Sequence, residues 1–183
     1  MSASRLFLNR RVLTVDDNPT IHEDFRKILS KEAATDGRLE DLESNFFEAR
    51  SQPDAHDGFE VDSASQGEEG LAKVLLAVEQ HRPYAVAFVD MRMPPGWDGV
   101  ETIARLWSAD PALQVVICTA YSDHSWREIL TQLGNRDNLA VLKKPFDNIE
   151  VIQLCETLSR KWSLARALHD PERTPPHAQK TAT

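Results

Sequence analysis

The sequence has few of the features that mark several classes of protein. Two cysteines in 183 residues are too few for a disulfide framework. No apolar run approaches the roughly 18 residues of a membrane-spanning helix, and the apolar part of the N-terminal segment is too short for a signal peptide. Positive charge is also scarce, because 21 Lys and Arg stand against 29 Asp and Glu. We therefore expect a cytoplasmic protein with reduced cysteines that binds neither membranes nor, directly, nucleic acid.

The composition is that of an ordinary globular domain. With 41% apolar and 27% charged residues, a chain of this length can build one domain with a substantial core. We predict an N-terminal extension over 1–9, one domain over 10–168, and a disordered tail over 169–183. The six histidines show no metal-ligand spacing, and we expect His22 to be a surface or capping residue.

Apolar segments typical of strands alternate with segments of helical periodicity. The segment 84–89 is apolar throughout, as a central strand covered on both faces should be. Helix starts are marked by Asn18-Pro19 and by the capping-box spacing of Ser65 with Glu68. This alternation predicts an α/β fold with five βα units and right-handed crossovers. The predicted strands are at about 11–16, 59–64, 84–90, 113–119 and 139–142.

One region between the first helix and the second strand exceeds a minimal five-unit domain. Leu39, Leu42, Phe46 and Ala49 recur at helical spacing. We therefore predict a helical insert over about 34–58, which forms either an added layer beside the first helix or a surface for a partner.

The last helix is also longer than such a domain needs, and we predict that it extends over about 147–168. Beyond about Arg160 we expect no more sheet for it to cover, so Trp162, Ala165 and Leu168 would need another partner. A heptad seam along this helix predicts a homodimer through it. The seam consists of Val151, Cys155, Leu158, Trp162 and Ala165.

Polar side chains follow or end four of the predicted strands. Asp16 and Asp17 follow the first strand, Asp90 ends the third, Thr119 ends the fourth, and Lys144 follows the fifth. Each residue alone fits a turn, a helix cap or a solvated charge. In an open parallel sheet, however, ligands bind outside the carboxyl ends of the strands, so these side chains should share one pocket.

Such a pocket suits a divalent metal and a phosphoryl group. Carboxylates that lie close together repel one another unless a cation lies between them. Mg²⁺ favours oxygen ligands, keeps several waters and usually takes one or two carboxylates together with phosphate. One carboxylate would remain as a nucleophile toward phosphorus, with Lys144 and Thr119 beside the phosphoryl oxygens.

Five segments of the chain also carry a resemblance to a known family. They are Val15-Asp16-Asp17-Asn18, Phe88-Val89-Asp90-Met91-Arg92-Met93-Pro94, Asp98-Gly99, Cys118-Thr119-Ala120 and Lys144-Pro145-Phe146. In this order they resemble the response regulator receiver (CheY-like) domains of two-component phosphorelay systems. The resemblance covers roughly residues 10–160 apart from the insert. It implies a flavodoxin-like (βα)5 doubly wound parallel sheet with strand order 2-1-3-4-5.

The resemblance also implies a role for each matching residue. Asp90 would accept a phosphoryl group from a phosphohistidine on a histidine kinase or phosphotransfer protein. Such a chain is a signalling domain, not an enzyme, apart from self-phosphorylation by small phosphodonors and self-dephosphorylation. The implied Mg²⁺ ligands are Asp17 directly, Asp16 through water, Asp90 and the backbone carbonyl of Arg92, with Thr119 and Lys144 beside the phosphoryl group.

One position departs from the family pattern. Receivers usually carry Tyr or Phe three positions before the lysine, and this chain has Val141 there. Thr119 can still move, but an aromatic flip at this strand is unavailable, and Tyr121 or Trp126 are the candidates to substitute for it.

Two alternatives stay open. The chain would also fit as the receiver portion of a longer signalling protein, such as a hybrid sensor kinase or a cyclic-di-GMP enzyme. A haloacid-dehalogenase-like phosphohydrolase also places an Asp at a strand end. It needs a second acid two residues later, however, where this chain has Arg92.

Overall fold

The computed structural model describes residues 8–30, 58–120, 126–134 and 136–169. The predicted helical insert and tail lie outside the described residues, apart from their end positions, and so do Tyr121 and most of the N-terminal extension. In the part of the chain that is described, no helix is both long and apolar enough to cross a membrane.

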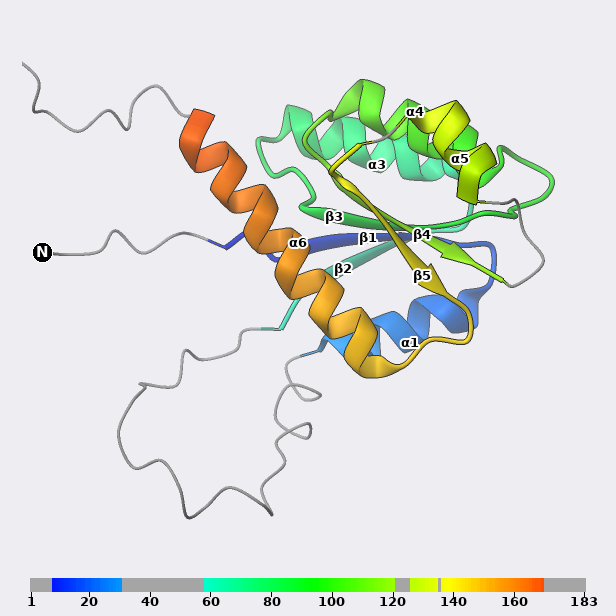
Figure 1. Cartoon of the computed structure of the whole chain (residues 1–183). Coiled ribbons are helices and arrows are strands. Elements are labelled where there is room, and N and C mark those ends of the chain that lie inside the picture. The colour runs from blue at the N-terminus through cyan, green and yellow to red at the C-terminus, as the bar shows by residue number, and fades with distance from the viewer. Residues whose placement is uncertain (1–7, 31–57, 121–125, 135, 170–183) are drawn as a thin grey trace, which may run out of the picture.

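The described residues form five strands and five helices. The strands are β1 (Arg11–Val15), β2 (Glu60–Ala64), β3 (Val86–Asp90), β4 (Gln114–Thr119) and β5 (Leu139–Lys143). The helices are α1 (Pro19–Leu29), α3 (Gly67–Glu79), α4 (Gly99–Ala109), α5 (Trp126–Leu133) and α6 (Asn148–His169). All strand pairs are parallel, in the order β2-β1-β3-β4-β5. Helices α1 and α6 cover one face of the sheet and α3, α4 and α5 cover the other (Figure 1), which confirms the predicted flavodoxin-like fold.

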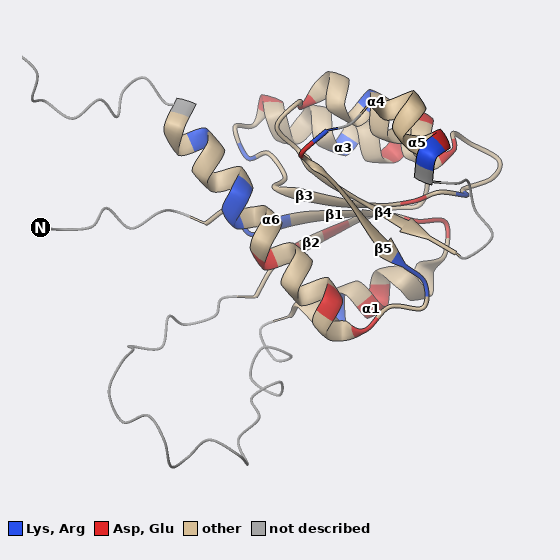
Figure 2. Ribbon diagram, viewed as in Figure 1, with Lys and Arg blue, Asp and Glu red and all other residues tan. Residues whose placement is uncertain are grey.

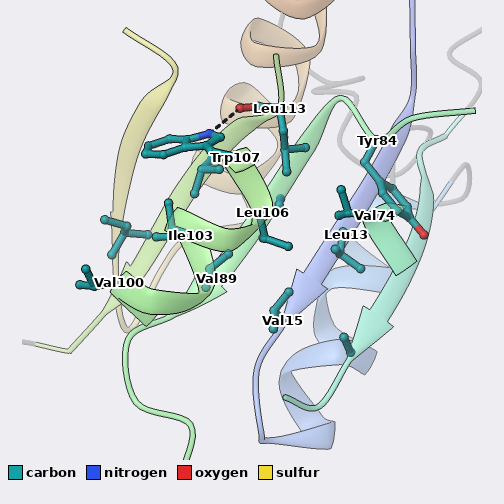
Figure 3. Packing of buried hydrophobic residues seen from close by; sticks show 14 of the residues in the cluster. Leu13, Val15, Val74, Tyr84, Val89, Val100, Ile103, Leu106, Trp107 and Leu113 are labelled. Atoms are coloured by element: carbon teal, nitrogen blue, oxygen red, sulfur yellow. Dashed lines mark hydrogen bonds between the residues drawn. The ribbon is translucent and has the colours of Figure 1, made fainter. Parts of the chain in front are cut away.

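The strands send alternate side chains into two separate cores. From β1, Leu13 and Val15 join the core under α3, α4 and α5, whereas Val12 joins the core under α1 and α6. In the first core the indole Nε1 of Trp107 donates to the carbonyl oxygen of Leu113 at 3.0 Å (Figure 3). Burial on both faces explains why the central strands are apolar almost throughout.

Helix starts follow the sequence signals, with one exception. Asn18 caps α1 by accepting a hydrogen bond from the first turn. The predicted capping box of Ser65 and Glu68 is wrong, because α3 begins after Gln66, whose side chain makes no capping bond. Instead, the Glu69 carboxylate accepts a hydrogen bond from the Ser65 backbone N–H at 2.8 Å. The predicted capping box requires Ser65 as the N-cap, but the N-cap of α3 is Gln66, one residue later. The carboxylate that accepts from the backbone before the helix therefore also comes one residue later, from Glu69 and not from Glu68.

The last helix is extended, as predicted, but four of the five residues of its heptad seam face the sheet, and only Ala165 is exposed. Val151 and Cys155 are fully buried, and Leu158 and Trp162 are each 8% exposed. The expectation that Trp162 lies beyond the sheet is therefore wrong. Because α6 runs obliquely across the sheet (Figure 1), Trp162 still reaches the core under α1 and α6.

His22 is buried in this structure, which corrects the expectation of a surface or capping role. It is 6% exposed, and its Nδ1 lies 3.0 Å from the hydroxyl of Thr14 on β1. The sequence signal is weak because a single threonine within an apolar strand does not reveal which helix residue will pair with it.

Candidate functional site

The candidate site lies at the carboxyl ends of β1, β3, β4 and β5. Asp16 directly follows β1, Asp90 ends β3, Thr119 ends β4, and Lys144 directly follows β5. The strand register brings these ends together, because Asp90 is paired with Cys118 and Thr119 with Lys143. The topology thus collects residues from four separate parts of the sequence at one edge of the sheet.

Lys144 is the centre of the site. Its Nζ donates to Asp16 Oδ2 and to Asp90 Oδ1, both at 2.7 Å. The side chains of Asp16, Asp90 and Lys144 are only 5%, 12% and 24% exposed. Short, partly desolvated contacts of this kind are charge-assisted hydrogen bonds, which are stronger than neutral ones.

Backbone contacts orient the same side chains. The Asn18 N–H donates to Asp16 Oδ1, and the Arg92 N–H donates to Asp90 Oδ2, each at 2.9 Å. The Lys144 N–H donates to the Thr119 carbonyl at 2.8 Å. Each carboxylate therefore has one oxygen fixed by the backbone and the other facing the Lys144 ammonium.

The charges of the site change the proton affinity of its groups. Burial alone would lower the pKa of Lys144, but hydrogen bonds and attraction from Asp16 and Asp90 outweigh it and raise this pKa above 10.5. Burial also raises the pKa of the Cys118 thiol on β4. Cys118 is unpaired and buried, so it remains a protonated packing residue next to the site.

Two predicted residues lie at the same edge outside this close group. The Thr119 hydroxyl donates to the Ala120 carbonyl at 3.1 Å. Asp17 follows Asp16 in the chain and is exposed. Among the described residues, no three His, Cys, Asp or Glu side chains are gathered closely enough to hold a metal ion.

The residues present nevertheless fit Mg²⁺. Asp16 and Asp90 are hard oxygen donors already fixed by backbone N–H groups, and the exposed Asp17 lies next in the chain. Mg²⁺ usually takes only one or two carboxylates and keeps several waters, so it does not require three acids gathered beforehand.

Gly99 is a positioning residue that the sequence analysis included in a motif but did not explain. A Cβ at this position would lie 2.5 Å from the Asp90 carbonyl oxygen and 2.8 Å from the Met91 Cα. The side chain of Asp98 caps α4 by accepting from the Glu101 N–H at 2.8 Å. The Asp98-Gly99 pair therefore starts α4 directly against the backbone of the Asp90 loop, which only glycine allows at this distance.

Comparison with protein families identifies one match. Residues 39–156 match the family model described as the response regulator receiver domain. The strand β1 and the helix α1 precede the matched range, yet β1 lies between β2 and β3 in the sheet. No curated protein sequence matches the chain.

Solved structures share the fold at low sequence identity. An adenylate cyclase from Rhodopirellula baltica has 21% identity and a TM-score of 0.64, and the match covers 91% of this chain and 100% of that chain. A response regulator receiver domain protein (CheY-like) from Methanospirillum hungatei JF-1 has 18% identity and a TM-score of 0.59, covering 85% and 98%. NtrX from Brucella abortus, in complex with ATP, has 20% identity and a TM-score of 0.61, covering 94% of this chain and 32% of that chain.

These identities establish similarity of fold. The match to the family model establishes more than the fold, because it covers residues 39–156, which are more than half of the 183 residues. On this basis the chain belongs to the response regulator receiver domain family.

Proposed function

We propose that this chain is a phosphoacceptor, in which Asp90 takes a phosphoryl group from a histidine kinase or phosphotransfer protein in a Mg²⁺-dependent reaction. The observation that carries the proposal is the position of Lys144, 2.7 Å from both Asp16 and Asp90. One ammonium between two carboxylates leaves an excess of negative charge, and Asp17 adds to it. Such a site is suited to a second cation and to a transferable anion that this cation neutralises.

The same geometry supports the proposed transfer step. A carboxylate oxygen of Asp90 attacks phosphorus, the P–N bond of the phosphohistidine breaks as the new P–O bond forms, and the imidazole leaves and takes up a proton. The Arg92 N–H holds Asp90 Oδ2 at 2.9 Å, which restricts the rotation of the nucleophile. Lys144 then pairs with a phosphoryl oxygen, and the Thr119 hydroxyl donates to another.

Asp16, Asp17, Asp90 and the backbone carbonyl of Arg92 are the residues that would hold Mg²⁺. The ion, when bound, supplies charge neutralisation at the phosphoryl oxygens. Asp16 and Asp90 then have to share Lys144 with the incoming phosphoryl group.

Phosphorylation then switches a surface that a partner reads, because it adds close to two negative charges at the sheet edge. In this proposal Thr119 moves without an aromatic partner on β5, where Val141 is 36% exposed. A homodimer through α6 would use the exposed Leu164 and Leu168 and not the seam that packs on the sheet. We place this signalling domain in the cytoplasm, either free-standing or as the receiver portion of a longer protein.

The test is incubation of the full chain with Mg²⁺ and acetyl phosphate, followed by intact-mass measurement. The wild type should gain the mass of one phosphoryl group, and Asp90→Asn should gain none. Asp17→Asn should abolish Mg²⁺ binding, measured by tryptophan fluorescence, whereas Lys144→Ala should still bind the metal. The exposed Asp147→Asn is the matched control and should behave as the wild type. Phosphorylation of Asp90→Asn at the wild-type level would refute the assignment.

The same protein samples also test the haloacid-dehalogenase-like alternative. Such an enzyme would hydrolyse a phosphomonoester in many turnovers and would need an acid where Arg92 lies. A receiver should instead carry at most one phosphoryl group per chain and should hydrolyse no phosphomonoester.

A further inference from the structure

Among the described residues, exposed leucines occur as pairs on two helices. On α3, Leu75 and Leu76 are each 52% exposed, and on α6, Leu164 and Leu168 are 47% and 83% exposed. A single exposed hydrophobic residue is normal on a protein surface. Apolar side chains that adjoin one another on the surface more often mark a contact with another molecule. The two leucine pairs are therefore candidate contact surfaces.

Acidic residues flank the leucines of α3. The buried residues of this helix are Gly67, Gly70, Val74 and Ala77. The exposed residues on the opposite side form what we call the α3 outer face, which consists of Glu68, Ala72, Leu75, Leu76 and Glu79. A glutamate therefore lies at each end of the apolar part. The single lysine of the helix, Lys73, has its Nζ 3.3 Å from Oε1 of Glu69, so the α3 outer face is apolar and acidic.

Basic residues accompany the leucines of α6. Arg160, Leu164 and Leu168 are exposed and follow one another at intervals of four residues, which places them on one side of the helix. We call these three residues the α6 end face. The Lys and Arg residues of α6 lie in its C-terminal half (Figure 2), and the sequence has no Asp or Glu from 157 to 168. The α6 end face is therefore apolar and basic.

The two faces cannot meet within one chain. Helix α6 lies on the same side of the sheet as α1, whereas α3 lies on the other side (Figure 1). The sheet and its two cores separate them. A contact between the α6 end face and the α3 outer face therefore has to join two copies of the chain.

Charge decides which faces pair. Two α3 outer faces would bring glutamates against glutamates, and two α6 end faces would bring basic helix ends together. Like charges across an interface oppose association. Pairing the unlike faces instead places Arg160 near Glu68 or Glu79, around an apolar centre to which both faces contribute leucines.

We propose that the α6 end face of one chain binds the α3 outer face of a second copy. Each chain carries one face of each kind, so the contact joins unlike surfaces. The proposal deepens the homodimer of the proposed function, on which it rests, because it names the surface that the α6 leucines contact. It does not depend on phosphoryl transfer at Asp90.

The strength of this contact follows from its small size. Small interfaces between proteins are weak and transient, so we expect a Kd on the order of 10–100 µM. Salt screens charges at the exposed rim of a contact. Self-association should therefore weaken as the salt concentration rises.

Sedimentation velocity of the full chain over a concentration series, without phosphodonor, tests the proposal. Leu75→Ser/Leu76→Ser removes the apolar centre of the α3 outer face, and Leu164→Ser/Leu168→Ser removes that of the α6 end face. Each double variant alone should associate about tenfold more weakly than the wild type. An equimolar mixture should associate more tightly than either variant alone, because the intact face of one meets the intact face of the other. Ile149→Ser, at an exposed position outside both faces, is the matched control and should associate as the wild type.

Charge reversal supplies a second measurement. Glu68→Lys/Glu79→Lys should weaken self-association, and so should Arg160→Glu. A mixture of these two variants should associate more tightly than either alone, because it restores a basic α6 end face opposite an acidic α3 outer face.

Three results would overturn the proposal. They are a wild type that stays monomeric up to about 1 mM, a leucine variant that associates as the wild type, and mixtures that associate no more tightly than their components. Wild-type association of the α3 variant alone would indicate contact between two α6 helices, and wild-type association of the α6 variant alone would indicate contact between two α3 helices. Absence of phosphorylation by acetyl phosphate would count against the phosphoacceptor assignment and not against this contact.

Discussion

Replacing Lys144 by methionine tests whether its ammonium neutralises the acidic site. The substitution keeps most of the apolar stem and leaves Asp16 and Asp90, which now share the ammonium at 2.7 Å, without a cation between them. Removing one partner of a buried ion pair costs roughly 3–5 kcal/mol in other proteins. Because the Lys144 side chain is 24% exposed, water screens part of this effect, and we expect a loss of about 2 kcal/mol.

The pH dependence has a definite sign. The pKa of Lys144 is raised above 10.5, so its contribution to stability is complete at neutral pH. It is lost only as the pH rises through the raised value. Unfolding by urea at neutral pH in the presence of a chelator therefore measures the whole effect.

The same unfolding experiment in the presence of Mg²⁺ distinguishes a neutralising role of Lys144 from a merely structural one. A ligand that binds only the native state stabilises it in proportion to the logarithm of its concentration over Kd. Lys144→Met should gain more stability from Mg²⁺ than the wild type does, because the ion has no competing ammonium. The double variant Asp90→Asn/Lys144→Met should recover stability in chelator, since one of the two repelling charges is gone.

The control is Lys27→Met, which removes an exposed lysine of α1. It should change the free energy of unfolding by no more than about 0.5 kcal/mol. If Lys144→Met is as stable as Lys27→Met in chelator, or if Mg²⁺ stabilises it no more than the wild type, the role of Lys144 as the neutralising cation is refuted.

Three further predictions address the scaffold. Gly99→Ala should destabilise the fold by about 1–3 kcal/mol and reduce phosphorylation by acetyl phosphate, because its Cβ would lie 2.5 Å from the Asp90 carbonyl oxygen; unchanged urea unfolding and unchanged phosphorylation would contradict this. Asp110→Asn should be more stable than the wild type by about 1 kcal/mol at neutral pH. The raised pKa of Asp110 means that the wild type gains stability as the pH falls, so the difference should vanish in acid; a difference that is constant in urea titrations at several pH values would contradict it. Ile103→Ala, in the fully buried part of α4, should lower the free energy of unfolding by about 2–5 kcal/mol, and calorimetry showing a loss below 1 kcal/mol would indicate a poorly packed core.

The sequence was sufficient to predict the fold and the convergence of Asp16, Asp90 and Lys144 at one edge of the sheet, because both follow from the strand pattern. An apolar run that ends in Asp90 or Thr119 identifies a strand and also the sheet edge at which its last side chain lies. Parallel topology then brings together residues such as Asp16 and Lys144 whose separation in the chain carries no information about distance. The resemblance of five sequence segments to receiver domains made the strand order predictable as well.

What the sequence did not predict depends on helix orientation. The seam of α6 was recognised correctly as an apolar stripe, but whether Trp162 meets the sheet depends on the angle at which the helix crosses it. The same applies to His22, whose partner Thr14 is defined by how α1 rotates over β1. Periodicity shows which residues share a face of a helix, not what that face contacts.

The contacts of Lys144 explain how one site can be stable without a metal and still receive one. The ammonium binds Asp16 and Asp90 by two hydrogen bonds of equal length, so the native state tolerates both carboxylates with no other ion present. A single ammonium cannot neutralise two acids and the nearby Asp17, however, and this residual negative charge attracts a divalent cation. In the proposed function, a cation that shares the carboxylates would leave Lys144 available to pair with a phosphoryl oxygen. The positive charge that stabilises the site in this structure would then be the same charge that the phosphorylated site uses.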